Sequence, residues 1–198
     1  MGWEKVFFEV DLTDVKTPDL DPNWQKTQHN YSRQQIDGWI RQLGEIQRLS
    51  VERGYTYDDF QRMRNSLAPL ERELGQTHHK FYDHGPLMTV NKDFVSLTWN
   101  GKEYEIDING NHRVYAAQEM GIRRMPAEVS VRSEQMEQLK RKVFVSNLMH
   151  PSDLADFSRS QDQNPQLPTR NTTISATRTP SRTDQPQPSK AQPERISR

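Results

Sequence analysis

The strongest constraint on the fold is a pattern of short elements between residues 94 and 131. Two runs, 94–99 and 104–108, alternate apolar and polar residues with the period of a β-strand. Asn100 and Gly101 lie between them, and both residue types tolerate the positive φ angles of a tight turn. We therefore expect an antiparallel β-hairpin over this stretch.

A helix and a further strand follow the hairpin. The helix is expected from about residue 111 to 120 and ends at Gly121, since glycine favours the left-handed conformation that closes many helices. Pro126 precedes a run of strand-forming residues, 127–131. The hairpin, this helix and the last strand are predicted to form a compact strand–strand–helix–strand unit within residues 87–131, and a further short strand is expected before them at 87–90.

The first third of the chain predicts one strand and one long helix. Residues 5–12 are rich in Val and Phe and favour a strand, and an irregular loop follows up to Tyr31. Ser32 and Gln35 have the spacing of a capping box, and Gly54 ends the helix that they open. We expect its apolar face to pack on the sheet, with Trp39 largely buried. That face consists of Ile36, Trp39, Ile40, Leu43, Ile46 and Leu49.

A second helical segment is expected over residues 55–82. Thr56 and Asp59 form another capping box, Pro69 is expected to divide the helix, and Gly75 to end it. Its apolar stripe is also expected to pack on the sheet. That stripe consists of Phe60, Met63, Leu67, Leu70 and Leu74. Residues 78–84 hold three histidines and an aspartate. We favour a solvated polar link over a metal site, because a loop does not fix ligand geometry.

The C-terminal part divides into helical segments and a tail. Ser133 is expected to start a helix over 134–146, and residues 152–157 to form a last helical turn. Residues 158–198 hold six of the twelve prolines, seven basic and three acidic residues, and almost no large apolar side chains. Such a segment buries too little surface to offset its ordering entropy, so we expect a disordered tail after a domain of residues 1–157.

Composition excludes several classes of function. The chain has no cysteine, which rules out disulfides, thiolate catalysis and cysteine-bound zinc. The 157 residues before the tail carry 20 basic and 24 acidic residues, so they lack the strong positive field of a general nucleic-acid binder. No stretch approaches the length of a membrane span, and no signal-peptide apolar run is present. We expect a cytoplasmic protein without membrane contact, although export that uses no signal peptide is compatible with the sequence.

The turn at residues 107–113, Asp-Ile-Asn-Gly-Asn-His-Arg, is the candidate site. A strand ends there, the chain turns at Gly110, and a helix begins whose first N–H groups have no partner within the helix. Arg113 lies in that first turn, where the helix dipole disfavours a cation. A bound phosphate would offset this cost. The alternative is that Gly110 only makes a tight turn and that His112 and Arg113 are surface residues.

The residues from Asp107 to Gly121, followed by Met125-Pro126-Ala-Glu-Val129, resemble the core of the ParB/sulfiredoxin superfamily. The pattern of the superfamily is a strand, an Asp-Gly-x-His-Arg or Gly-Glu-Arg-Arg turn, an Ala-Ala helix, a glycine and a proline-led strand. The resemblance extends over residues 5–132. It implies an α+β fold, a small mixed sheet flanked by helices, with residues 55–82 as a helical insertion. It also implies a nucleotide-phosphate site at the turn.

Three branches of the superfamily differ at this turn. Sulfiredoxins carry a cysteine where Asn111 stands, so that activity is excluded. ParB partition proteins bind CTP with a Gly-Glu-Arg-Arg turn and a later Glu-Asn-x-x-Arg helix, to which residues 146–150 are only a weak match. The third branch has a His-Arg turn after an aspartate and includes ParB-like nucleases and kinases of free serine. This branch resembles the present turn best.

Chemistry suggests a role for each side chain. We expect Arg113 to hold two phosphate oxygens in a fork and His112 to donate to phosphate or to transfer a proton. Asp107 is expected to position Mg²⁺ or to act as a base, and Glu105 shares its face of the strand and could share the metal. For Glu105 the simpler interpretation, an exposed strand residue, is favoured. The phosphate- or nucleotide-binding set is Asn109, Gly110, Asn111, His112 and Arg113.

Two classes of function remain open from the sequence. The first is metal-dependent phosphoryl chemistry on a nucleotide or nucleic acid, as a nuclease or as a nucleotide-dependent kinase or NTPase, with Mg²⁺ and a nucleotide such as CTP or ATP. The second is a non-catalytic module that senses a nucleotide or binds a protein, including a DNA-partition-like or toxin/effector role. The helical insertion is the expected surface for a protein partner or a homodimer.

Overall fold

The computed structural model describes residues 2–28, 30–83, 94–107, 109–153 and 157. All of them belong to the first of two units into which the chain divides, Met1–Pro165 and Gln166–Arg198. The strand expected at 87–90, the last histidine of the 78–84 segment and the tail 158–198 lie outside the described residues.

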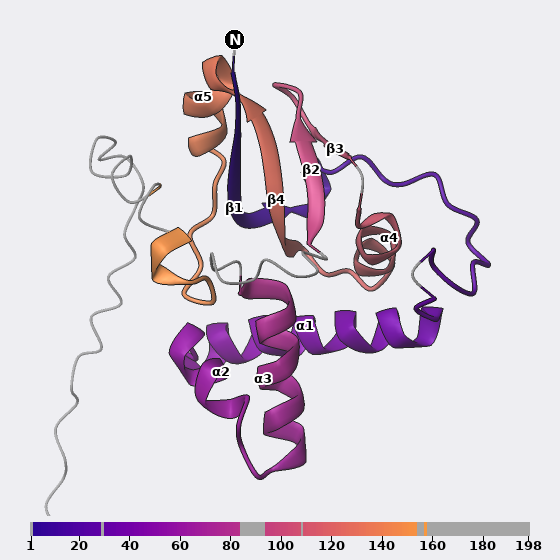
Figure 1. Ribbon diagram of the computed structural model, residues 1–198, viewed down its shortest axis with the longest axis vertical. Coiled ribbons are helices and arrows are strands. Elements are labelled where there is room, and N and C mark those ends of the chain that lie inside the picture. Colours follow the sequence, from indigo (N-terminus) through magenta and orange to yellow (C-terminus); the bar gives the residue numbers. More distant parts are fainter. Residues whose placement is uncertain (1, 29, 84–93, 108, 154–156, 158–198) are drawn as a thin grey trace, which may run out of the picture. The chain divides into compact units, whose positions relative to one another are not determined.

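The described part forms an α+β structure around one mixed sheet (Figure 1). Its order is β1-β4-β2-β3, with β4 antiparallel to β1, β2 parallel to β4 and β3 antiparallel to β2. The fold class predicted from the sequence is thereby confirmed at the level of a small mixed sheet with helices. The strands are β1 (Trp3–Asp11), β2 (Val95–Trp99), β3 (Tyr104–Ile106) and β4 (Arg124–Arg132).

The hairpin of β2 and β3 is confirmed, with Leu97 opposite Ile106 and Trp99 opposite Tyr104. Its connection is longer than the Asn-Gly pair alone. The Asn100 side chain accepts hydrogen bonds from the backbone N–H groups of Lys102 and Glu103, at 2.9 and 3.0 Å. The loop is therefore closed by a side chain as well as by the positive φ of Gly101.

The helix α4 (Asn111–Glu119) connects β3 to β4 and is followed by Gly121 at a φ of 69°. The predicted strand–strand–helix–strand order is therefore confirmed over residues 95–132. β4 begins earlier than predicted, at Arg124, and includes Pro126. Proline is tolerated there because pairing of β4 with β2 begins only at Ala127.

The long helix α1 (Arg33–Arg53) has the predicted ends. Ser32 and Gln35 form the capping box, and Gly54 closes the helix in the left-handed conformation. Five of the six stripe residues are buried, whereas Trp39 is only half-buried. α1 packs mainly against α4 and against α3 (Pro69–Tyr82), near one end of the sheet, so the expectation that its apolar face packs on the sheet is wrong (Figure 1).

The second helical segment differs most from its prediction. Pro69 divides it as expected, because α2 (Tyr57–Met63) ends before it and α3 starts on it. Gly75, however, does not end the helix. A Cβ at this position would lie 2.6 Å from the Arg64 Cα and 2.7 Å from the Met63 carbonyl carbon, so Gly75 serves the close packing of α3 on the end of α2.

The predicted polar link is therefore wrong for residues 78–82, which form the last turns of α3. His78 is fully buried, with its ring stacked between Phe60 and Tyr82 at centroid distances of 4.8 and 4.9 Å. The expectation that the apolar stripe of this segment is buried on the sheet is also partly wrong, since Leu67 and Leu70 are 95% and 77% exposed. The helical pair has its own interface, α2 on α3, and the two leucines lie outside it.

The segment after β4 is less helical than predicted. Only a 3-10 turn (Ser133–Gln135) and α5 (Met136–Lys140) form within the expected helix 134–146. The chain instead returns to the sheet, where Phe144 forms an isolated antiparallel bridge with Glu9 of β1. Residues 151–153 are helical, and Phe157 is buried against Phe8 with their rings 5.7 Å apart. Among the described helices, none has the length and apolar character needed to cross a membrane.

Candidate functional site

The turn between β3 and α4 is fixed by its contact with β2. Gly110 has a φ of 117°, and a Cβ on it would lie 2.9 Å from the Val95 Cγ1 and 3.1 Å from the Val95 Cα. The Ser96 N–H donates to the Asn109 carbonyl, and the Asp107 N–H donates to the Ser96 carbonyl, both at 2.9 Å. Glycine is thus required by both backbone conformation and space. The start of α4 is held on the sheet as a result.

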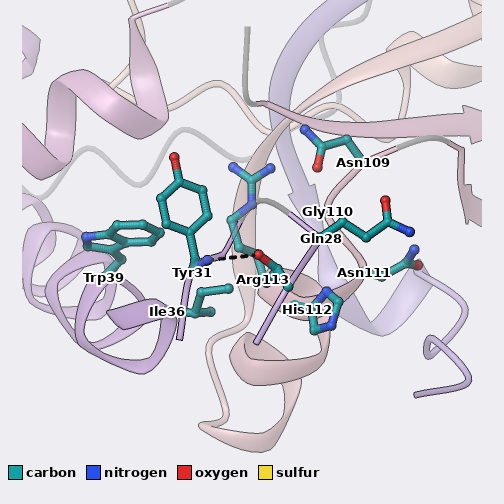
Figure 2. A pocket seen from close by; sticks show the side chains of 10 residues that line it. Gln28, Tyr31, Ile36, Trp39, Asn109, Gly110, Asn111, His112 and Arg113 are labelled. Carbon is teal, nitrogen blue, oxygen red and sulfur yellow. Dashed lines mark hydrogen bonds between the residues drawn. The ribbon is translucent and has the colours of Figure 1, made fainter. Parts of the chain in front are cut away.

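A cavity of about 130 Å³ opens beside this turn (Figure 2). We call it the turn pocket. One wall comes from the turn and the first residues of α4, and the other from the loop before α1 and from α1 itself. Its lining residues are Thr27, Gln28, Tyr31, Ile36, Trp39, Asn109, Gly110, Asn111, His112 and Arg113. All five residues of the predicted phosphate-binding set therefore lie in one pocket.

Arg113 is the buried cation of the turn pocket. The residue is only 6% exposed, and Figure 2 shows its guanidinium reaching upward between Tyr31 and Asn109. It belongs to the first turn of α4, next to the N–H groups that have no carbonyl partner within the helix. Among the described residues that line the pocket, none is an aspartate or glutamate. The pocket is therefore suited to an anion.

His112 lies beside Arg113 and is half-buried. Its ring packs edge-to-face against the buried Trp24, with the centroids 4.5 Å apart. This burial lowers the pKa of His112 below its ordinary value of 6.5. The imidazole is therefore mainly neutral at pH 7, with one nitrogen able to donate a hydrogen bond and the other able to accept a proton.

The opposite wall comes from residues that sequence reasoning did not assign to the site. The loop residues Thr27 and Tyr31 hydrogen-bond to each other, with the Thr27 N–H donating to the Tyr31 carbonyl at 2.9 Å. Tyr31 and Trp39 pack edge-to-face at 5.0 Å, and the Lys80 Nζ of α3 lies 2.9 Å from the centroid of the Trp39 ring. These residues share no local motif with the turn. The half-buried position of Trp39 on an otherwise buried stripe is explained by its place in the pocket wall.

The two carboxylates expected to act in catalysis lie elsewhere. Asp107 and Glu105 are both exposed, and neither lines the turn pocket. Glu105 instead accepts a hydrogen bond from the Asn100 side-chain amide at 3.1 Å. In the histidine-rich segment 78–84, His79 pairs with Asp83 at 2.7 Å. Within the described residues, no group of three or more His, Asp or Glu side chains is arranged to hold a metal ion.

No protein-family model, curated protein or solved structure matches the chain.

Proposed function

We propose that the chain is a ParB/sulfiredoxin-like domain that binds a phosphate group, carried by a nucleotide or a nucleic acid, in the turn pocket. One observation carries the proposal. The N-terminal turn of α4 and the buried Arg113 meet in a pocket without a lining carboxylate among its described residues. The backbone N–H groups of the first helical turn, which have no carbonyl partner within the helix, the positive end of the helix dipole and a guanidinium favour the same kind of ligand.

The size of the turn pocket limits what it encloses. Sites that enclose a drug-sized ligand measure roughly 300–1,000 Å³. A cavity of about 130 Å³ is well below this range. It has room for a single phosphate group, so the sugar and base of a nucleotide would lie outside it. We therefore expect phosphate to dominate recognition and the identity of the base to contribute less.

Catalysis is the second candidate function, and His112 is the observation that favours it. A neutral imidazole beside a bound phosphate can accept a proton from an attacking water or hydroxyl. Metal-dependent chemistry through Asp107 would need its exposed carboxylate to reach a ligand that extends out of the pocket. Release of phosphate from ATP and CTP with and without Mg²⁺, compared between wild type and His112→Ala, tests this candidate.

The binding test is calorimetric titration with matched ligands. Wild type is titrated with inorganic phosphate, ADP, ATP, CTP and a short oligonucleotide, each with and without Mg²⁺, and with adenosine and cytidine as phosphate-free controls. We expect the phosphorylated ligands to bind and the nucleosides not to bind. Equal affinity for nucleosides and nucleotides, or no binding by any ligand, would overturn the proposal.

Arginine variants test the guanidinium. Arg113→Ala should weaken binding at least ~10-fold, since hydrogen bonds to charged groups contribute about 1.5–3 kcal/mol each. Arg113→Lys should recover little of this loss, because an ammonium cannot replace the two-pronged contact. Arg41→Ala is the matched control, because Arg41 is exposed on α1 and does not line the pocket. Equal binding by all three variants would show that Arg113 does not contact the ligand.

Asn111→Asp separates ligand binding from helix stability. An acidic side chain in the first turn favours the helix dipole, so the variant should fold at least as stably as wild type. The same negative charge faces the pocket and should repel a phosphate. Retained stability with lost binding is the expected pair of results. Retained stability with unchanged binding would place the ligand elsewhere.

A further inference from the structure

A second cavity lies on other elements and shares no lining residue with the turn pocket. We call it the Glu9 pocket. Its volume is about 480 Å³, within the range of small-molecule sites. It is built by β1, the second half of α1, the start of β4 and the chain at 144–148. The lining residues are Glu9, Gln47, Ser50, Val51, Arg123, Arg124, Phe144, Val145, Ser146, Asn147 and Leu148.

The inner end of the Glu9 pocket is a buried polar cluster. Glu9 is 3% exposed and accepts a hydrogen bond from the Tyr82 hydroxyl. The Gln47 side-chain amide donates to that hydroxyl at 3.3 Å and to the Arg124 carbonyl at 2.9 Å. Burial raises the pKa of Glu9, and the Tyr82 hydrogen bond and the Arg124 charge oppose that rise. The carboxyl group is thus biased toward its neutral form.

Arg124 is the unusual side chain of this pocket. Its guanidinium carbon lies 3.4 Å from the centroid of the Phe144 ring, and the residue is half-buried. Within the part of the chain that the structure describes, the guanidinium makes neither a hydrogen bond nor an ion pair. The neighbouring Arg123, in contrast, pairs with Asp11 at 3.0 Å. A guanidinium stacked on a ring keeps its in-plane N–H donors open, so Arg124 offers a two-pronged donor to a ligand.

The pocket also offers apolar surface. Phe144 is 43% exposed and Val51 is 87% exposed, both unusually open for large apolar side chains, and Leu148 is a buried residue of the same lining. An apolar body placed here would cover surface that is otherwise in contact with water. The apolar surface and the guanidinium line the same cavity. Phe144 is part of the apolar surface, and its ring is also the one on which Arg124 stacks.

We propose that the Glu9 pocket binds a small organic carboxylate with an apolar body. The carboxylate would accept two hydrogen bonds from Arg124, and the body would pack on Phe144 and Val51. The site does not depend on phosphate binding at α4, because no residue of the turn pocket takes part.

The test is an NMR titration of the full chain with three probes that share a benzyl group: phenylacetate, its neutral isostere phenylacetamide and the cation phenethylamine. We expect phenylacetate to shift the backbone amide signals of residues 144–148 and Val51 saturably, with an affinity at least ~10-fold higher than that of the neutral amide. Tighter binding of the amine would show that Glu9 decides the charge of the ligand and would overturn the proposal. Equal binding of all three probes, or no saturable shift, would overturn it as well.

Two variants locate the binding. Arg124→Gln should lower phenylacetate affinity to that of the amide probe, whereas Arg132→Gln on the exposed end of the same strand should leave it unchanged. Phe144→Ala should weaken all three probes, since it removes the apolar wall. If Arg124→Gln does not fold, the wild-type comparison of the three probes still decides the result. Unchanged phenylacetate affinity in folded Arg124→Gln would contradict the proposal.

Discussion

Two regions of the molecule depend on a glycine at a close approach of the backbone, and for different reasons. At the turn before α4, Gly110 combines a positive φ with a close contact to Val95 of β2. Between α2 and α3, Gly75 lies inside a helix, and its missing Cβ leaves room for the backbone of Arg64. The turn is strained for any other residue by its own dihedral angles. The helical pair is sensitive only because a second helix end lies against it.

The same contrast extends to the polar groups in each region. The turn places a buried Arg113 next to backbone N–H groups that have no carbonyl partner within α4, an arrangement that suits an anion. The α2–α3 pair buries His78 among aromatic rings, with its Nε2 within hydrogen-bonding distance of the Leu148 carbonyl at 2.9 Å. In the first region the buried polar side chain, Arg113, lines a pocket. In the second region the buried polar side chain, His78, packs within the core. Substitutions in each region should therefore differ in kind as well as in size.

The largest effect is expected at the turn. Gly110→Ala should lower the free energy of unfolding by about 2–5 kcal/mol, because a left-handed backbone costs about 1–2 kcal/mol and overpacking about 1–3 kcal/mol. Gly54→Ala is the matched control. Gly54 also has a positive φ, but a Cβ added there would have nothing within 4 Å. Denaturant unfolding of both variants should give the smaller loss at Gly54, and equal losses would show that the Val95 contact is not tight.

The next effect is a pH dependence in the helical pair. Burial lowers the pKa of His78 from 6.5 to about 4. Below pH 6.5 His78 therefore binds a proton in the unfolded chain but stays neutral in the folded chain. As a result, the free energy of unfolding falls as the pH drops to about 4. The shift corresponds to about 3 kcal/mol. Unfolding free energies of wild type should show this loss between pH 7 and 4, and those of His78→Phe, which keeps a ring in the stack, should lack it.

The raised pKa of Glu9 acts in the opposite direction over this range, since the folded chain takes up that proton first as the pH falls. Its contribution cancels when the wild-type and variant curves are subtracted. His150→Gln serves as the control, because that ring is only half-buried. An equal pH dependence in wild type and His78→Phe would place the acid sensitivity elsewhere.

A smaller change in the free energy of unfolding is expected for Gly75→Ala, and its sign is the informative result. Alanine gains about 1 kcal/mol of helix propensity over glycine, whereas overpacking costs about 1–3 kcal/mol. The contact is with backbone atoms, so we expect the upper end of the overpacking cost and a net loss of about 2 kcal/mol. Gly38→Ala in α1 is the control with open space at the Cβ, and it should stabilise the protein. Thermal unfolding of both variants gives the signs, and stabilisation by Gly75→Ala would show that α2 moves away freely.

The smallest effect is expected for Leu67→Ser at the tip of the helical pair. Leu67 is 95% exposed, so its replacement should change the unfolding free energy by less than about 0.5 kcal/mol. Light scattering of wild type and variant adds a second readout. A change in oligomeric state without a change in stability would mark the tip as a contact between copies of the chain. A stability loss of several kcal/mol would contradict its exposed position.

Much of the fold follows from local sequence signals. The capping boxes at Ser32 and Thr56, the hairpin at Gly101 and the helix end at Gly121 all occur where predicted, because each is set by residues within a few positions of one another. The predicted residues of the candidate site are likewise close to one another in the sequence. Residues 109–113 reach one pocket because the strand, the turn and the helix that carry them are consecutive.

Local signals alone were therefore enough for the sheet unit at 95–132, the long helix and the side chains that meet at the start of α4. Long-range packing, in contrast, placed Gly75 inside a helix, His78 in the core, and Tyr31 and Trp39 in one pocket with Arg113. It also brought β1 and β4, which lie more than a hundred residues apart in the chain, together around the Glu9 pocket. Turns and caps are governed by dihedral angles and hydrogen bonds between near neighbours. Whether a side chain is buried depends instead on which residues, distant in the sequence, pack against it in the folded protein. No local sequence pattern specifies those residues.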